Sequence, residues 1–167
     1  YFIRLFKRTI LLGYVFSHVC FSILLGQNRS HQAVIAKGEN VSCYLGVDPA
    51  DMVGFRMENN NWEQIPIQID ERAILDAAVP YNSPQPIGAE LLLYTDPNTF
   101  TGADPNPEFD ENDELVFMFS DAGSKDPGLV NPPGTIPGSK CEVAICDPVT
   151  MDTSFIYLFE NAGFLLQ

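Results

Sequence analysis

The sequence has little histidine and no recognisable catalytic motif. It contains two histidines, and only His31 follows the apolar N-terminal stretch. A Ser-His-Asp set and a zinc site built from several imidazoles or thiolates therefore lack support. GxSxG, phosphate-binding glycine loops and redox CxxC are also missing. Two carboxylates can hydrolyse a glycoside, but 22 acidic residues give no reason to choose one pair. We assign no catalytic residue and expect a non-catalytic protein.

Basic residues are also few. The chain has 9 Lys and Arg against 22 Asp and Glu, and four of the basic residues precede residue 31. Residues 31–167 thus hold five basic and 22 acidic residues, a formal charge of −17. Such a surface repels nucleic acid and anionic lipid, so we expect neither as a partner. It attracts cations, calcium above all; the alternative is an acidic surface that only aids solubility.

The N-terminal segment resembles an export signal. Three basic residues within the first eight positions precede an uncharged apolar run over residues 9–25. This pattern predicts a signal peptide over residues 1–26, with cleavage after Ser22 or Gly26 left open, and hence a secreted protein. The alternative is a membrane anchor, which usually needs about 20 apolar residues. Two glycosylation sequons, at Asn28 and Asn40, agree with secretion.

Four cysteines become three if the signal peptide is removed with Cys20. An odd number in an oxidising compartment leaves one thiol free or paired with another chain. Cys141 and Cys146 flank a predicted strand, which separates them by about 17 Å on opposite faces, so they should not pair with each other. Cys43 is expected to pair with one of these two.

The mature sequence is patterned as strands almost throughout. Apolar residues alternate with polar ones, or form short runs between turns, and residues 71–79 are the only stretch with helical character. Asn residues at 59–61 favour a hairpin turn, and Pro66 indicates an edge strand or a bulge. We expect one all-β domain over residues 31–167, an antiparallel β-sandwich with long acidic and Pro/Gly-rich loops, in a protein that continues beyond residue 167. The predicted strands cover residues 41–47, 53–57, 62–70, 91–94, 115–119, 141–146 and 155–159.

An acidic loop precedes the predicted central strand 115–119. From residue 104 to residue 114 an oxygen-bearing side chain recurs at every second position. Calcium takes six to eight oxygen ligands from carboxylates, amides and carbonyls, so this loop can supply much of a shell, although its spacing is not that of an EF-hand. The alternative is a hydrated acidic loop. The expected calcium ligands are Asp104, Asn106, Asp110, Asn112 and Asp113.

A second candidate site lies on the predicted edge strand. Gln68 and Asp70 share one face, and Arg72 follows them. This polar row predicts a ligand-facing surface or a salt-bridged lock onto the acidic loop; the structural alternative is a strand end capped by an Asp/Arg pair. Four aromatic residues could stack on sugar rings, namely Trp62, Tyr81, Tyr94 and Phe100. Trp62 follows a polar turn and is the candidate for ligand binding; the alternative, which is more common for aromatics in a β-sandwich, is that these residues pack in the core.

The sequence reads W-E-Q-I-P-I-Q-I-D-E at residues 62–71 and F-D-E-N-D-E-L-V-F at residues 109–117. Together these two segments resemble a pattern of exported, largely uncharacterised β-rich modules, some associated with polysaccharide-processing proteins. The family pattern reads W-x-x-[IV]-P-[IV]-Q-[IV]-D-E … D-x-[ND]-D-E-L-V-F, and the likeness covers about residues 41–123. It implies an extracellular β-sandwich module in which the edge strand and the acidic loop are coupled, and it supplies no catalytic residue.

These observations lead to three hypotheses of function. The first is a secreted, non-catalytic module that binds an extracellular glycan or protein, with calcium bracing the acidic loop. The second, from the resemblance, is the N-terminal part of a polysaccharide-processing enzyme whose catalytic residues lie beyond this chain. The third is an extracellular structural or matrix component, crosslinked through the odd cysteine.

Overall fold

A computed structural model describes residues 31–163 of the chain. The chain divides into two units, Tyr1–His31 and Gln32–Gln167, and the fold below is that of the second. The predicted signal peptide and the sequon at Asn28 lie outside the described residues. No helix of the described part is long and apolar enough to cross a membrane.

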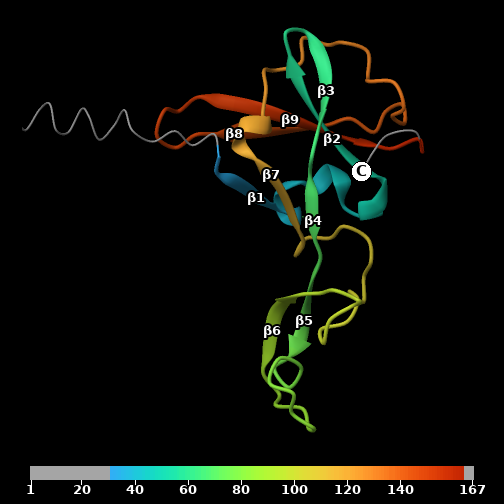
Figure 1. The fold of residues 1–167 in the computed structure, drawn as a ribbon, viewed down its shortest axis with the longest axis vertical. Coiled ribbons are helices and arrows are strands. Elements are labelled where there is room, and N and C mark those ends of the chain that lie inside the picture. Colours follow the sequence, from blue (N-terminus) through green and yellow to red (C-terminus); the bar gives the residue numbers. More distant parts are fainter. Residues whose placement is uncertain (1–30, 164–167) are drawn as a thin grey trace, which may run out of the picture. The chain divides into compact units, whose positions relative to one another are not determined.

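The fold consists of antiparallel strands and short 3₁₀ turns, which confirms the all-β prediction (Figure 1). The described residues form three sheets, with strand orders β1-β7-β4, β3-β2-β9-β8 and β5-β6. The elements are β1 (Ala33–Lys37), η1 (Gly38–Asn40), η2 (Ser42–Tyr44), η3 (Pro49–Asp51), β2 (Met52–Glu58), β3 (Asn61–Ile65), β4 (Gln68–Asp70), β5 (Arg72–Asp76), β6 (Glu90–Tyr94), β7 (Glu114–Met118), η4 (Phe119–Asp121), β8 (Cys141–Cys146) and β9 (Thr153–Glu160).

One edge segment runs through all three sheets in succession. β3 is the edge of the four-stranded sheet, β4 is the edge of the three-stranded sheet, and β5 enters the hairpin. Pro66 lies between β3 and β4, where it has no amide to donate and interrupts the pairing, so the chain changes sheets there. In Figure 1, β3, β4 and β5 follow one another along one path, and the β5–β6 hairpin lies apart from the two larger sheets.

The main core lies between the two larger sheets. Strand β9 contributes Ile156 and Leu158, and β7 contributes Leu115 and Phe117. The other residues of β9 point to the opposite face because side chains alternate along a strand. There Tyr157 and Phe159 form a second cluster with residues of β2. Strands β2 and β9 are thus buried on both faces, as the unbroken apolar run at residues 155–159 predicted for the latter.

The Pro/Gly-rich loop 126–139 is anchored to the second cluster. The indole Nε1 of Trp62 donates to the carbonyl of Val130 at 2.8 Å, and the amide of Asp126 donates to the hydroxyl of Tyr157 at 2.6 Å. Lys140 forms an ion pair with Asp126 at 2.8 Å. Trp62 also packs edge-on against Phe55, Tyr157 and Phe159. Its ring therefore lies within the aromatic cluster.

Two local predictions were wrong. Residues 41–47 form no strand: the 3₁₀ turn η2 covers Ser42–Tyr44, and its short period brings Tyr44 and the preceding cap residue Val41, three positions apart, into the main core. Residues 72–76, predicted as helical, form β5, because the segment pairs along its whole length with β6. Tertiary pairing outweighs the weak helical preference of an Ala- and Leu-containing stretch. The predicted hairpin turn is confirmed, with Asn59 and Asn60 both at positive φ.

Cys43 and Cys141 form a disulfide, which confirms the expected involvement of Cys43 and selects its partner. Cys141 lies at the start of β8 and is buried in the main core, whereas Cys146 at the other end is exposed with a free thiol. The bond joins the 3₁₀ region after β1 to the outermost strand of the four-stranded sheet. It therefore crosslinks segments that are 98 residues apart in sequence.

Candidate functional site

The acidic loop folds around its own side chains. The carboxylate of Asp104 accepts from the amide of Asn106 at 2.8 Å, and that of Asp110 accepts from the amide of Asn112 at 2.9 Å. The side chain of Asn106 also donates to Asp110 at 3.1 Å. Short Asp and Asn side chains satisfy nearby backbone amides in this way, which gives the loop an ordered path without regular structure.

Asp113 lies at the centre of this loop. Its side chain is 0% exposed and accepts from two backbone amides, that of Asp110 at 2.8 Å and that of Arg72 at 2.8 Å. Burial raises the pKa of this carboxyl, and the charges of Asp110 and Asp104 raise it further, against the lowering effect of the two amides. Asp113 therefore joins the loop to the start of β5, although burial and neighbouring carboxylates destabilise its ionised form.

Arg72 completes the connection between the loop and the hairpin. Its guanidinium donates to the carbonyl of Asn112 at 2.6 Å and forms an ion pair with Glu114, and both side chains of the pair are largely buried. The same group lies over the ring of Tyr94, 5.8 Å from the ring centroid. The hydroxyl of Tyr94 in turn donates to Glu114 at 2.8 Å. Arg72 thus has the salt-bridged contact with the acidic loop that was one of the sequence interpretations.

Four carboxylates from different segments lie close enough to one another, beside the contact between Arg72 and the acidic loop, to interact through their charges. The pKa of Glu71 is raised by burial and then by the charges of Asp104, Asp113 and Asp48. Like charges at short range destabilise the ionised state, and a bound cation would relieve that repulsion. Among residues 31–163, however, no group of three or more His, Cys, Asp or Glu side chains is arranged as a metal site in this conformation.

One buried oxygen in the loop has no partner. The side-chain Oδ1 of Asn112 is inaccessible to solvent and accepts no hydrogen bond from the described part of the chain. An unpaired buried acceptor is costly, and such atoms call for an explanation. Asn112 is one of the five expected calcium ligands, and an amide oxygen suits that ion. Of those five residues, the structure connects Asp104, Asn106, Asp110 and Asn112 in one hydrogen-bonded chain, with Asp113 beside them.

The four expected ligand-binding residues, Trp62, Gln68, Asp70 and Arg72, do not form one cluster. Gln68 donates to Asp70 along the exposed edge of β4, and Arg72 is engaged by the acidic loop. Trp62 belongs to the aromatic cluster on the four-stranded sheet. Asn40, the described sequon residue, ends η1 and is exposed.

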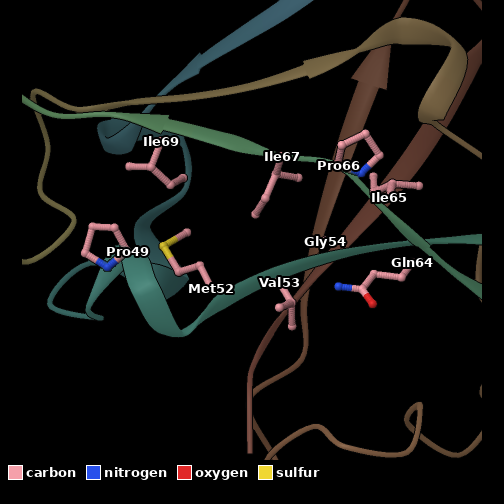
Figure 2. A pocket seen from close by; sticks show the side chains of 9 residues that line it. All are labelled: Pro49, Met52, Val53, Gly54, Gln64, Ile65, Pro66, Ile67 and Ile69. Atoms are coloured by element: carbon pink, nitrogen blue, oxygen red, sulfur yellow. The ribbon is translucent and has the colours of Figure 1, made fainter. Parts of the chain in front are cut away.

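Two hollows border the edge segment. The first, about 600 Å³, is largely apolar; Figure 2 shows Ile67 and Ile69 pointing from that segment toward Pro49 and Met52. A Cβ at Gly54 would collide with Ile67, so glycine there permits the close approach of the two sheets. The second hollow, about 420 Å³, is acidic and aromatic. It is lined by Pro49, Ile69, Asp70, Glu71, Tyr94, Thr95, Asp96 and Pro97.

An exposed apolar face on the β5–β6 hairpin was missed by the sequence analysis. Ile74 is 62% exposed and Leu92, directly opposite, is 46% exposed. Tyr94 on the same face is 57% exposed. The short apolar run at residues 91–94 predicted one strand of this face, but the helical interpretation of residues 71–79 removed the strand that forms the other half.

The fold and these contacts define an all-β module whose edge segment is coupled to an acidic loop. Comparisons with protein-family models, with curated proteins and with solved structures found no match to the chain.

Proposed function

We propose that this protein is a secreted, non-catalytic β-sandwich module that binds a glycan or a protein outside the cell. The observation that carries the proposal is the solvent-exposed face of Ile74, Leu92 and Tyr94 on a hairpin that Arg72 ties to the acidic loop. Contiguous apolar side chains on a polar protein mark interaction surfaces. The disulfide between Cys43 and Cys141 is compatible with an oxidising, extracellular environment.

Calcium bracing of the acidic loop is the second part of the proposal. The unpaired Oδ1 of Asn112 and the mutual repulsion around Glu71 and Asp113 are features that a divalent cation would relieve. The carboxylates of Asp104 and Asp110 now accept backbone amides within the loop, so ligation requires some of them to turn toward the ion. Calcium would supply charge neutralisation and rigidity there.

Thermal unfolding of the protein in millimolar calcium and in excess chelator tests the brace. A ligand present at 100 times its dissociation constant adds about 2.7 kcal/mol to the free energy of unfolding, which raises Tm by several degrees. The variant Asp110→Asn should lose this rise. Asp152→Asn, which removes an exposed acid in the turn between β8 and β9, should keep it. Equal melting with calcium and with chelator would eliminate the calcium site.

Ligand class is tested by screening arrays of extracellular glycans and of matrix proteins with the same preparation, with and without calcium. Binding that is lost when Leu92 is replaced by lysine would place the ligand on the hairpin face. Binding unaffected by this change would move the ligand site elsewhere. The absence of binding to either array would contradict the module hypothesis.

A structural role through crosslinking is a second candidate, and the free, exposed thiol of Cys146 favours it. Under this hypothesis, non-reducing gels of secreted protein should show a dimer that disappears in Cys146→Ser. A monomer under both conditions would exclude crosslinking through this thiol.

A further inference from the structure

The outer edge of β6 is open for strand pairing. Among the described strands, β6 pairs with β5 alone. The amide of Ala77 donates to Ala89 and the amide of Thr95 donates to Glu71, which fixes the two ends of the hydrogen-bonded ladder. Because hydrogen-bonded and non-hydrogen-bonded pairs alternate in antiparallel sheets, the backbone groups of residues 90, 92 and 94 point away from β5. They form a row of donors and acceptors at the edge.

The corresponding edge of β5 is less available. Its outward amide at Arg72 already donates to Asp113 at 2.8 Å, so the acidic loop occupies the start of that edge. Edges of this kind are usually protected by lysine, proline or a covering segment, and β6 carries none of these within the described chain. A two-stranded hairpin is also marginally stable alone and is stabilised by an added strand.

An acidic pocket continues from the end of β6. The 420 Å³ hollow is lined by Tyr94, the last residue of β6, together with three carboxylate residues, Asp70, Glu71 and Asp96. Repulsion from neighbouring acids raises the pKa of Glu71 in addition to the effect of burial. A lysine or arginine side chain entering this hollow would meet carboxylates and an aromatic ring, both of which attract cations.

Within residues 31–163, no basic side chain is left without an acidic partner to occupy this pocket. All five Lys and Arg residues of that part are in ion pairs with acids of the same chain. A second copy of the chain would bring the same excess of acids, 22 against five basic residues over residues 31–167, toward this acidic pocket, and like charges repel. The charge pattern therefore favours a foreign, basic segment over self-association.

We propose that the outer edge of β6 receives an extended basic segment of a protein partner by strand addition. The segment pairs with Glu90–Tyr94, covers Leu92 with alternate apolar side chains, and places a lysine or arginine in the pocket of Asp70, Glu71 and Asp96. This inference rests on the proposed binding function and narrows it to a protein ligand.

Synthetic peptides test the pairing without altering the fold. The probe is an eight-residue peptide of alternating isoleucine and threonine with two lysines at each end, titrated against the full chain by fluorescence anisotropy at low salt. A second peptide has glutamates in place of the lysines, and a third has the lysines but N-methylated amides along one edge. We expect the lysine peptide to bind, and the other two to bind at least tenfold more weakly.

Matched variants of the protein locate the site. Leu92→Lys should weaken the lysine peptide at least tenfold, whereas Val130→Lys, an equal charge change at an exposed loop residue, should leave it within twofold. Glu71→Gln should weaken it about fivefold, because one pocket charge is lost. Asp152→Asn makes the same charge change away from the pocket and should have no effect.

Three results would overturn the inference. They are no detectable lysine-peptide binding at millimolar concentration, equal binding of the N-methylated peptide, or equal effects of Leu92→Lys and Val130→Lys. Sedimentation that shows a dimer abolished by Leu92→Lys would assign the edge to a second copy instead. If the glycan or protein arrays still report a ligand while the peptides fail, the binding function stands and only this site is wrong.

Discussion

A side-chain oxygen of Asp113 accepts a hydrogen bond at 2.8 Å from the backbone amide of Arg72, a residue 41 positions earlier. This contact joins the last turn of the acidic loop to the first residue of β5. It uses an amide on the edge of β5 that points away from β6. The orientation of the hairpin therefore depends on a carboxylate that is itself buried.

Replacement of Asp113 by alanine should destabilise the protein strongly. Two backbone amides, of Arg72 and Asp110, would lose their acceptor in a buried position, and each buried unpaired donor costs about 1–3 kcal/mol. We expect a loss of about 3 kcal/mol in urea unfolding. Asp113→Asn keeps one acceptor oxygen and should lose less than half of this amount. Equal losses in the two variants would mean that both carboxylate oxygens are needed, because asparagine has the same size as aspartate and leaves no cavity.

Glu71 should oppose folding at neutral pH. Its pKa is raised in the folded state, so its contribution to stability is fully present below its ordinary pKa and is lost as the pH rises through the raised value. In chelator at pH 7, Glu71→Gln should therefore raise Tm by about 2 °C. Near pH 3.5 the variant and the parent should melt together. A gain that persists unchanged at low pH would assign the effect to something other than the charge.

The disulfide should be a major source of stability. Cys43 and Cys141 are 98 residues apart in sequence, and the chain-entropy model assigns about 4.7 kcal/mol to a crosslink that closes a loop of this size. We expect the double replacement of these cysteines by alanine to lower the free energy of unfolding by about that amount. Cys146→Ala should leave it within about 0.5 kcal/mol, because the thiol is exposed. Calorimetry of oxidised and reduced protein gives the same comparison without mutation.

Gly38 should not tolerate a side chain. A Cβ there would overlap the carbonyl oxygen of Asp110, and the amide of Gly38 donates to the carbonyl of Asp113 at 2.8 Å. Gly38→Ala should thus displace the acidic loop and destabilise the fold by about 2–3 kcal/mol. Glu39→Ala, in the same turn but exposed, removes only a surface ion pair and should cost less than about 0.5 kcal/mol. A small effect at Gly38 would mean that the loop yields easily.

Local pattern was sufficient for the strands that are buried on one or both faces. The unbroken apolar run at residues 155–159 and the alternation at residues 53–57 predicted β9 and β2, because the period of a strand is visible in a few residues. The Asn-rich turn at residues 58–61 was equally local, since only the conformation of two residues is at issue. Pro66 indicated an edge or a bulge for the same reason: its missing amide is a property of one residue.

Long-range contacts were not visible in the sequence. Strand β1 was not predicted, because its five residues form a strand by pairing with β7, about 80 positions away. Residues 72–76 were predicted as helical, because their strand conformation depends on pairing with β6. The partner of Cys43 and the packing of Trp62 against Tyr157 and Phe159 also depended on distant segments. The β class, the charge excess and the acidic loop could be predicted from composition and short periods, which are local properties. The contact between Arg72 and Asp113 and the open edge of β6 emerged only in the folded chain, because chain topology sets the hydrogen-bond partners across a fold.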